Sequence, residues 1–237
     1  MRVRDEVAIV TGAGQGIGRA TALLLAREGA NLALCDIVQD KVERVGREVE
    51  ALGRQVLTGQ VDVARRAEAR RMVSRTIKRF GRIDILVNNA GIAESASIDQ
   101  LSEADWDRMF DVHLKGTLFF SQAVLAQMMK QRSGRIVNIA SRAGQAGTQF
   151  YPHYSVAKAG IICLTKVLAR FGGPHGIRAN CVSPGFTDTD MVKVVDEKYL
   201  ASRLKGAPIQ RLGKPEEVAS TVLFLASEES SFITGQN

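Results

Sequence analysis

The chain has 237 residues, of which 45% are hydrophobic and 24% charged, and its formal net charge at pH 7 is +7. This length suits one α/β domain over residues 1–237, with enough apolar residues for a core. No apolar run approaches the roughly 20 residues that a membrane-spanning helix needs, and the N-terminus enters a strand pattern without the features of a signal peptide. We therefore expect a cytoplasmic protein with no membrane partner.

The three cysteines, Cys35, Cys163 and Cys181, are widely spaced and match no metal-binding pattern, and each lies in an apolar run. We expect buried free thiols, in keeping with a reducing cytoplasm, and no metal site.

The positive charge raises the question of a nucleic-acid partner. The densest basic stretch, residues 65–82, carries apolar residues at helical spacing, which favours an amphipathic helix with a solvated basic face. A docking site for an acidic partner is the alternative for this stretch. Zinc-finger, helix-turn-helix and aromatic RNA-binding signatures are missing from the sequence, so we expect no nucleic-acid partner.

Short apolar, β-branched runs alternate with amphipathic stretches along nearly the whole chain. The pattern predicts strands over 7–11, 31–36, 55–61, 83–88, 135–140 and 177–182, and helices over 17–28, 40–52, 65–80, 103–131, 154–171 and 215–226. Such alternation is typical of βαβ units and predicts a parallel sheet with helices on both faces, in three α/β/α layers. Residues 186–213 interrupt the pattern with weak periodicity, and we expect a mobile loop or lid there.

A glycine-rich segment follows the first predicted strand. Residues 11–18 read T-G-A-G-Q-G-I-G and lead into the first predicted helix. Glycines let a turn close and let backbone N–H groups approach a pyrophosphate at a helix N-terminus, where the helix dipole favours anions. The spacing departs from G-x-G-x-x-G and matches T-G-x-x-x-G-x-G, which resembles the short-chain dehydrogenase/reductase family. That resemblance implies a Rossmann-type doubly wound fold and a phosphate cradle made of Gly12, Gln15, Gly16, Ile17 and Gly18.

Asp36 ends the second predicted strand. An acidic residue about 20 positions past the glycine loop is placed to accept hydrogen bonds from the adenosine ribose and to repel a 2′-phosphate. Gln15 stands where NADP-using members of the family often have a basic residue, whereas Arg19 is the one nearby cation that argues for NADP. A turn or N-cap carboxylate is the alternative for Asp36. We expect NAD as the cofactor in preference to NADP.

Three residues suggest the reaction. Tyr154 and Lys158 stand four apart at the start of an apolar helix, which puts them on one face. A free phenol has a pKa of about 10, and a nearby ammonium together with a positive nicotinamide would lower that pKa. Tyr154 is then suited to exchange a proton with an alcohol or ketone while Lys158 also holds the cofactor ribose. Ser141, after the fifth predicted strand, can hydrogen-bond the substrate oxygen, a strand-end cap being its alternative role.

Further segments in the family's order extend the resemblance over residues 7–236. It implies that an aspartate after the third strand meets the adenine, and that an asparagine-rich run after the fourth supports the end of the sheet beside the nicotinamide ribose. It also implies that the segment after the sixth strand contacts the carboxamide. The residues so implied are Asp62, Val63, Asn89, Ala90, Gly91, Pro184, Gly185, Thr187 and Thr189.

Two features depart from the family pattern. His113 occupies the place of an asparagine that, in many relatives, is a fourth catalytic residue holding a helix irregularity and a water path to the lysine. Histidine can donate a hydrogen bond and can titrate near neutrality, so we expect activity to survive; a locally satisfied helix histidine is the alternative. Relatives also continue past Thr-Gly-Gln into a final strand, which is missing after Asn237, and we expect the sequence to be incomplete there.

These features favour an NAD(H)-dependent oxidoreductase that interconverts a secondary alcohol and a ketone. Its small-molecule substrate is expected between residues 93–98, residues 142–151 and the 186–213 segment. Arg142 could meet a substrate carboxylate, although a plain surface arginine is the simpler interpretation. The resemblance also implies a homo-oligomer, either a tetramer or a dimer.

Two alternatives stay open. The first is an NADPH-dependent 3-oxoacyl-[acyl-carrier-protein] reductase, against which Asp36 and residues 142–153 argue. The second is a non-catalytic nucleotide-sensing protein, which would keep the glycine loop but need none of the residues Ser141, Tyr154 and Lys158.

Overall fold

A parallel sheet forms the centre of the molecule in this computed structural model, which describes residues 1–193 and 195–237. Its strands are β1 (Val7–Thr11), β2 (Asn31–Asp36), β3 (Val56–Gln60), β4 (Ile85–Asn88), β5 (Gly134–Ile139) and β6 (Ile177–Val182). All neighbouring strands are parallel, in the order β3-β2-β1-β4-β5-β6. The order reverses between β1 and β4, so the predicted doubly wound sheet is confirmed.

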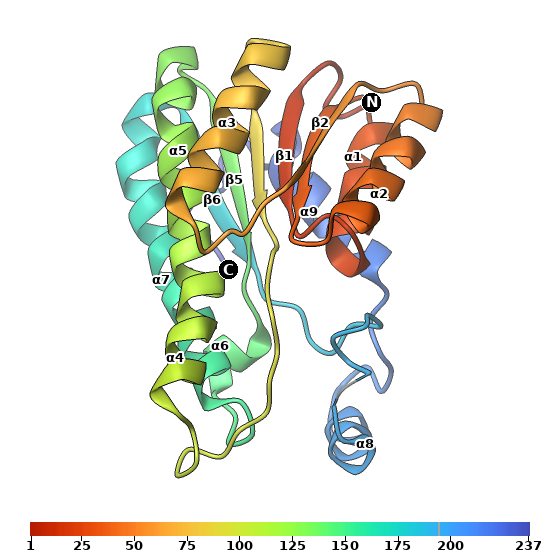
Figure 1. Cartoon of the computed structure of the whole chain (residues 1–237), viewed down its shortest axis with the longest axis vertical. Coiled ribbons are helices and arrows are strands. Elements are labelled where there is room, and N and C mark those ends of the chain that lie inside the picture. Colours follow the sequence, from red (N-terminus) through yellow and green to blue (C-terminus); the bar gives the residue numbers. More distant parts are fainter. Residues whose placement is uncertain (194) are drawn as a thin grey trace.

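Helices cover both faces of this sheet. They are α1 (Gly16–Arg27), α2 (Gln39–Ala51), α3 (Arg66–Phe80), α4 (Glu103–Phe110), α5 (Gly116–Gln131), α6 (Arg142–Ala146), α7 (Pro152–Gly172), α8 (Glu197–Lys205) and α9 (Pro215–Ala226). Figure 1 shows α3, α5 and α7 on one side of the strands and α1, α2 and α9 on the other. Among the described helices, none is both long and apolar enough to cross a bilayer.

The core lies in two layers, one on each face of the sheet. Successive residues of a strand point to opposite faces. In β1, Ala8 and Val10 therefore join the layer under α1, α2 and α9, whereas Ile9 joins the layer under α3, α5 and α7. Helices cover both layers, which explains why the strands are apolar throughout their length. The result is a rigid platform whose carboxyl-terminal edge carries the loops described below.

The segment 186–213 contains more regular structure than its sequence predicts. Its residues 197–205 form α8, whose N-cap Asp196 accepts a hydrogen bond from the Tyr199 N–H at 2.8 Å. Thr187 also pairs with Gly213 in an isolated parallel bridge. The sequence did not predict α8 because this helix buries none of its residues fully and so lacks a strong apolar periodicity. Val194 lies in this segment but outside the described residues.

Burial of the cysteines also differs from the expectation. Cys35 and Cys181 are buried, but Cys163 is exposed. Cys163 lies on α7, where Val156 and Val167 are exposed as well, so the apolar residues of this helix are not confined to the face that meets the core. An apolar helix was therefore an insufficient reason to predict a buried thiol.

The predicted helix over 103–131 is interrupted by a π-helical turn, Asp111–Lys115, between α4 and α5. π-Helical turns are rare and occur frequently at functional sites. The turn lies where the family resemblance implies a helix irregularity.

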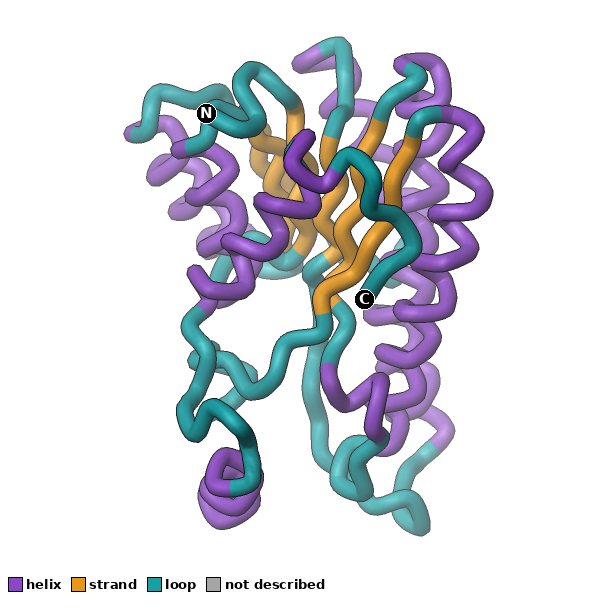
Figure 2. Tube along the Cα trace, turned by 180° about the vertical axis from the view of Figure 1, so that it is seen from behind, coloured by secondary structure: helices purple, strands orange, loops and turns teal. Residues whose placement is uncertain are grey.

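The C-terminal residues lie along the outer edge of β6 (Figure 2). The Gly235 N–H donates to the Ala179 carbonyl at 2.7 Å, and the Cys181 N–H donates to the Gln236 carbonyl at 2.9 Å. This stretch therefore supplies partners to backbone groups of β6 that would otherwise face outward.

Candidate active site

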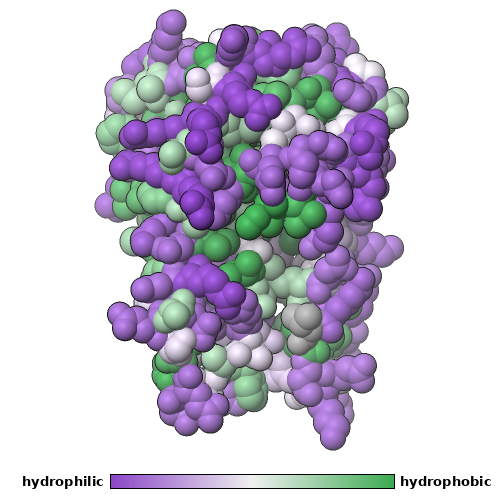
Figure 3. Space-filling model, in the orientation of Figure 1, coloured by the Kyte–Doolittle hydropathy of each residue, from purple (hydrophilic) through white to green (hydrophobic). Residues whose placement is uncertain are grey.

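A cavity of about 410 Å³ lies beyond the carboxyl ends of the strands, where ligands bind in sheets of this type. Figure 3 shows the surface hollowed on this side of the molecule, with apolar and weakly polar residues in the hollow. With one exception, Gly18, every predicted site residue lines this cavity. They are Gly12, Gln15, Gly16, Ile17, Asp36, Asp62, Val63, Asn89, Ala90, Gly91, His113, Ser141, Tyr154, Lys158, Pro184, Gly185, Thr187 and Thr189.

The glycine loop after β1 is held by the segment after β4. The Asn89 side-chain amide donates to the carbonyls of Thr11 and Gly12, both at 3.0 Å. Gly12 has a φ of +62°, and a Cβ there would lie 2.7 Å from the Ala90 Cα, so no larger residue fits. Gly18 lies behind the loop, where a Cβ would be 2.1 Å from the Gly12 carbonyl oxygen. Gly18 thus allows the helix and the loop to pack closely and lies outside the cavity lining.

Asp36 defines one end of the cavity. Its carboxylate accepts hydrogen bonds from the Gly14 N–H at 2.9 Å and from the Val38 N–H at 3.0 Å. A Cβ on Gly14 would lie 2.9 Å from the Asp36 Oδ2, and one on Gly16 would lie 3.0 Å from the Thr189 Cγ2. At Gly14 and Gly16 the loop therefore has only backbone atoms. This part of the loop lies at the start of α1, between Asp36 and the segment after β6. These residues fit a nicotinamide dinucleotide, with the carboxylate at a ribose and the glycines at the pyrophosphate.

The sequence interpretation missed the cation at this end. Lys41 lines the cavity beside Asp36, and its Nζ donates to the Gln15 Oε1. Arg19, the cation considered from the sequence, instead makes a bidentate salt bridge with Glu48. Arg19 is not among the described residues that line the cavity. The missed signal was position: Lys41 lies in the first turn of α2, the helix that follows the strand ending at Asp36.

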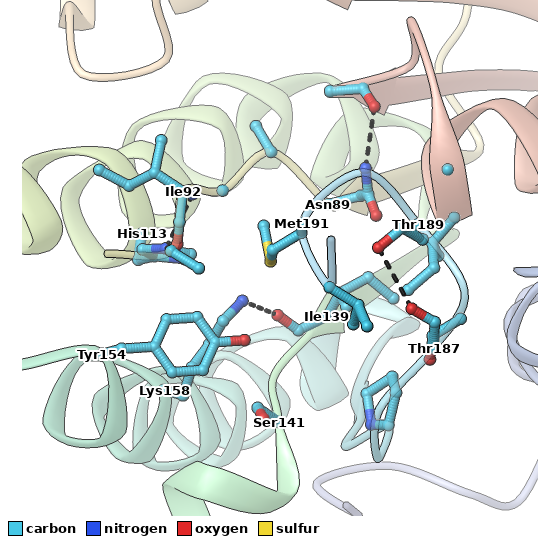
Figure 4. Close-up of a pocket in the computed structure, with 18 of the residues that line it drawn as sticks. Asn89, Ile92, His113, Ile139, Ser141, Tyr154, Lys158, Thr187, Thr189 and Met191 are labelled. Carbon is cyan, nitrogen blue, oxygen red and sulfur yellow. Dashed lines mark hydrogen bonds between the residues drawn. The ribbon is translucent and has the colours of Figure 1, made fainter. Parts of the chain in front are cut away.

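Tyr154, Lys158 and Ser141 meet at the inner end of the cavity. Pro152 begins α7, so Tyr154 and Lys158 lie one above the other in its first turns. The Lys158 Nζ donates to the Ile139 carbonyl at 2.6 Å and lies 5.5 Å from the centre of the Tyr154 ring. Figure 4 shows the phenol oxygen and the amine pointing into the same space, with Ser141 at the end of the strand below. The Ser141 Oγ accepts the Ala143 N–H at 3.1 Å, so it also caps α6.

Burial governs the acid–base properties of this group. It raises the pKa of the Tyr154 phenol, although the neighbouring Ser141 hydroxyl acts to lower it. Burial also lowers the pKa of Lys158 to about 7. Low-dielectric surroundings disfavour the charged forms of both groups in the protein without cofactor, whereas the lowering predicted for Tyr154 also involves the positive nicotinamide.

His113 lies in the π-helical turn, and its ring packs between the segment after β4 and Tyr154. Its Nε2 is 2.8 Å from the Ile92 carbonyl oxygen and 3.1 Å from the Ile92 nitrogen. Its ring meets that of Tyr154 edge-on, with centroids 5.3 Å apart. A Cβ on Gly91 would lie 2.4 Å from the His113 Cε1, so this glycine makes room for the imidazole.

Burial, followed by the charge of Lys158, lowers the pKa of His113 well below its usual value. Titration of His113 near neutrality, which a histidine at this place would allow, is therefore opposed by its burial. A neutral imidazole contacting the backbone of Ile92 fits a positioning role better than proton transfer.

The outer part of the cavity is walled by the three segments expected to bind substrate. The described residues of these walls include Ala93, Arg142, Ala143, Ala146, Thr148, Tyr151, Phe186, Met191, Val192, Val195, Tyr199 and Arg203. Tyr199 of α8 joins two of the walls, because its hydroxyl is 3.0 Å from the Thr148 Oγ1 and its ring lies 4.8 Å from that of Phe150. The walls are thus mainly apolar, and α8 closes one side of them.

Comparison with known proteins places this site in a family. Residues 12–237 match the family model described as enoyl-(acyl carrier protein) reductase. The chain is 42% identical over 236 residues to the 3-oxoacyl-[acyl-carrier-protein] reductase FabG of Thermotoga maritima, covering 100% of this chain and 96% of that protein. It is 44% identical over 236 residues to a subunit, BbsD, of (2S)-[(R)-hydroxy(phenyl)methyl]succinyl-CoA dehydrogenase from Thauera aromatica, covering 100% of this chain and 95% of that protein.

Solved structures give the same result. The crystal structure of gox2181 superposes with a TM-score of 0.96 at 34% identity, covering 99% of this chain and 93% of that one. A short-chain type dehydrogenase/reductase from Mycobacterium marinum superposes with a TM-score of 0.95 at 33% identity, with the same two coverages. The fold, the matched family model and these relatives agree, and the chain belongs to the short-chain dehydrogenase/reductase family of oxidoreductases.

Proposed function

We propose that this protein interconverts a 3-oxoacyl thioester and the corresponding 3-hydroxyacyl thioester, with NAD(H) as its cofactor. The observation that carries the proposal is the meeting of Tyr154, Lys158 and Ser141 at the inner end of one cavity whose outer walls are mainly apolar. Two relatives with over 40% identity are named for acyl-thioester substrates, one on acyl-carrier protein and one on coenzyme A. These names favour the reductase kept as an alternative above over a dehydrogenase of simple secondary alcohols.

In this proposal Tyr154 supplies the proton. Its raised pKa keeps the phenol protonated at neutral pH, which is the form that can donate to a ketone oxygen. Ser141 would hydrogen-bond the same oxygen and stabilise the charge that develops on it. Lys158 would hold the ribose of the cofactor and bias the phenol electrostatically. The nicotinamide, when bound, supplies or accepts the hydride at the carbon that bears this oxygen.

The proposed preference for NAD(H) rests on Asp36. Family membership implies a nicotinamide cofactor, and the acyl-carrier-protein reductase alternative was expected to use NADPH. Against that, a carboxylate at the end of β2 would repel a 2′-phosphate, and its two backbone hydrogen bonds hold it in place. Lys41 offsets part of this repulsion but is itself bonded to Gln15. We therefore keep NAD(H) as the proposed cofactor.

We also propose a cytoplasmic homo-oligomer, a tetramer or a dimer. Val156, Val167 and Phe171 are exposed on α7, and burying such side chains against a second copy would be favourable. Light scattering of the purified protein tests this: a monomeric mass at micromolar concentration would contradict it.

The experiment that tests the function compares substrate classes. Purified protein is assayed with one of three substrates: 3-oxobutyryl-CoA, the N-acetylcysteamine thioester of 3-oxobutyrate, or a simple ketone such as 2-butanone. NADH and NADPH are used in separate reactions. We expect kcat/KM to be highest for a thioester with NADH, and mass spectrometry to identify the 3-hydroxyacyl product. Faster turnover of the simple ketone than of either thioester would contradict the proposal.

A further inference from the structure

Two arginines from different elements line the outer part of the cavity. Arg142 is the first residue of α6, directly after Ser141, and its backbone N–H donates to the Pro184 carbonyl at 3.1 Å. Arg203 lies on α8, four residues after Tyr199. Residues four apart share one helix face, so the contacts of Tyr199 with the opposite wall turn Arg203 toward the cavity as well.

Neither side chain is paired. Among residues 1–193 and 195–237, no carboxylate forms an ion pair with Arg142 or Arg203, and neither guanidinium has a hydrogen-bond partner. Other arginines near this side of the molecule are engaged: Arg108 pairs with Glu94, and Arg211 pairs with Glu217 at 2.6 Å. In the described chain, Arg142 and Arg203 thus face the outer part of the cavity without a protein anion, whereas the other lining cations, Lys41 and Lys158, lie at its cofactor and catalytic parts.

Among the described residues that line the cavity, no acid lies at this end. Its described lining includes two carboxylates, Asp36 and Asp62, and both belong to the cofactor end, after β2 and β3. The substrate end combines apolar walls with two positive charges. A ligand that matches such a lining has an apolar body and an anionic group beyond it.

We propose that Arg142 and Arg203 bind an anionic oxygen group of the substrate, a carboxylate or a phosphate, and so select charged over neutral 3-oxoacyl thioesters. This inference rests on the proposed function and specifies its substrate class. A guanidinium matches the geometry of either anion through paired N–H groups. The contact lies away from the reacting carbonyl and is the same before and during hydride transfer. Its loss therefore raises KM and leaves kcat nearly unchanged.

The test uses three substrates that share the reacting ketone. The N-acetylcysteamine thioester of 3-oxobutyrate is neutral, 3-oxobutyryl-CoA carries phosphates on the thiol side, and the N-acetylcysteamine monothioester of 3-oxoadipate carries a carboxylate on the acyl side. Each is assayed with NADH and the wild type, Arg142→Gln, Arg203→Gln and the double variant. Arg4→Gln is the control, because Arg4 is exposed and precedes β1 at the opposite edge of the sheet.

We expect wild-type KM to be lowest for one of the charged substrates, and each cavity variant to raise that KM by about twofold to fivefold, as exposed charge pairs allow. The neutral substrate and the Arg4→Gln protein should be unaffected, and added salt should remove the wild-type preference. A preference for the CoA thioester assigns the anion to the thiol side, and one for the oxoadipate thioester assigns it to the acyl side. Equal KM values for all three substrates, or variants that change the neutral substrate equally, would overturn the proposal.

The experiments distinguish failure of the proposed function from failure of the proposed anion site. If the wild type reduces no thioester, the proposed function is wrong, and calorimetric binding of the three 3-hydroxy products still tests the arginines. Weaker binding of the charged products alone in the double variant would then support the anion site. Unchanged binding would exclude it.

Discussion

Lys158 is a buried amine, and this has a consequence for stability as well as for chemistry. Burial lowers its pKa to about 7 in the folded protein, whereas an unfolded lysine titrates at about 10.4. Between these two values the unfolded chain binds more protons at this position than the folded chain does. The free energy of unfolding therefore rises with pH through this window, and the buried charge destabilises the fold most below pH 7.

We predict that Lys158→Met raises Tm relative to wild type, measured without added cofactor, and that the gain is larger at pH 6 than at pH 9. Each unit of altered pKa corresponds to about 1.4 kcal/mol, so the effect should be several degrees. Lys166→Met, at an exposed position of the same helix, is the control and should show no such pH dependence. The same gain in Tm at both pH values would contradict the buried charge. Turnover should be lost in Lys158→Met, since the amine serves both the phenol and the ribose.

Asp36 should set the choice of cofactor. We predict that Asp36→Ala lowers the ratio of kcat/KM with NADH to that with NADPH, because removing the carboxylate removes a like-charge repulsion. Asp36→Asn separates charge from geometry, since an amide oxygen can still accept one of the two backbone hydrogen bonds. Asp40→Ala, four residues on and exposed, is the matched control. A wild type that already works better with NADPH would show that Asp36 does not have this role.

One side chain of the π-helical turn, His113, contacts the Ile92 carbonyl and the Tyr154 ring. We predict that His113→Asn keeps most activity, because asparagine is the family's residue at this place. His113→Ala should lose about tenfold to a hundredfold in kcat, since nothing then fixes the turn against Tyr154. Because His113 is neutral at pH 7, the kcat profile should keep its shape in His113→Asn. A limb near pH 6.5 that disappears in this variant would instead assign proton transfer to the imidazole, and full activity in both variants would leave only local helix structure.

Helix α8 is held to the opposite wall mainly through Tyr199. We predict that Tyr199→Ala raises KM for the acyl thioester while leaving NADH binding, measured by fluorescence titration, unchanged. Tyr199→Phe keeps the ring contact with Phe150 and loses only the hydrogen bond to Thr148, so its effect should be smaller. Equal KM values in all three proteins would mean that α8 does not shape the substrate site.

The strands and the cofactor-binding segments could be predicted from the sequence, whereas α8, the position of Lys41 and the pKa shift of Tyr154 could not. All six strands were predicted within two residues, because a sheet covered on both faces demands continuous apolar runs that are visible in one dimension. The cofactor-binding segments and Ser141 converge because each follows a strand and parallel strands end at one edge, whereas Tyr154, Lys158 and His113 are brought there by helices. Helix α8 was missed because it buries little, and Lys41 because the first turn of a helix gave no motif. The direction of the Tyr154 pKa shift depends on how deeply the fold buries the phenol, which no local pattern encodes.

In the proposed reaction, hydride passes between the nicotinamide and C3 of an acyl thioester while Tyr154 delivers the proton. A direct measurement follows deuterium into the product from reduced cofactor that carries two deuterium atoms at C4 of the nicotinamide ring, with 3-oxobutyryl-CoA as substrate, for wild type and Tyr154→Phe. We predict one deuterium at C3 of the 3-hydroxybutyryl product, formed at least about a hundredfold more slowly by Tyr154→Phe, with cofactor binding little changed. Product without deuterium at C3, or near-normal turnover by Tyr154→Phe, would contradict the account.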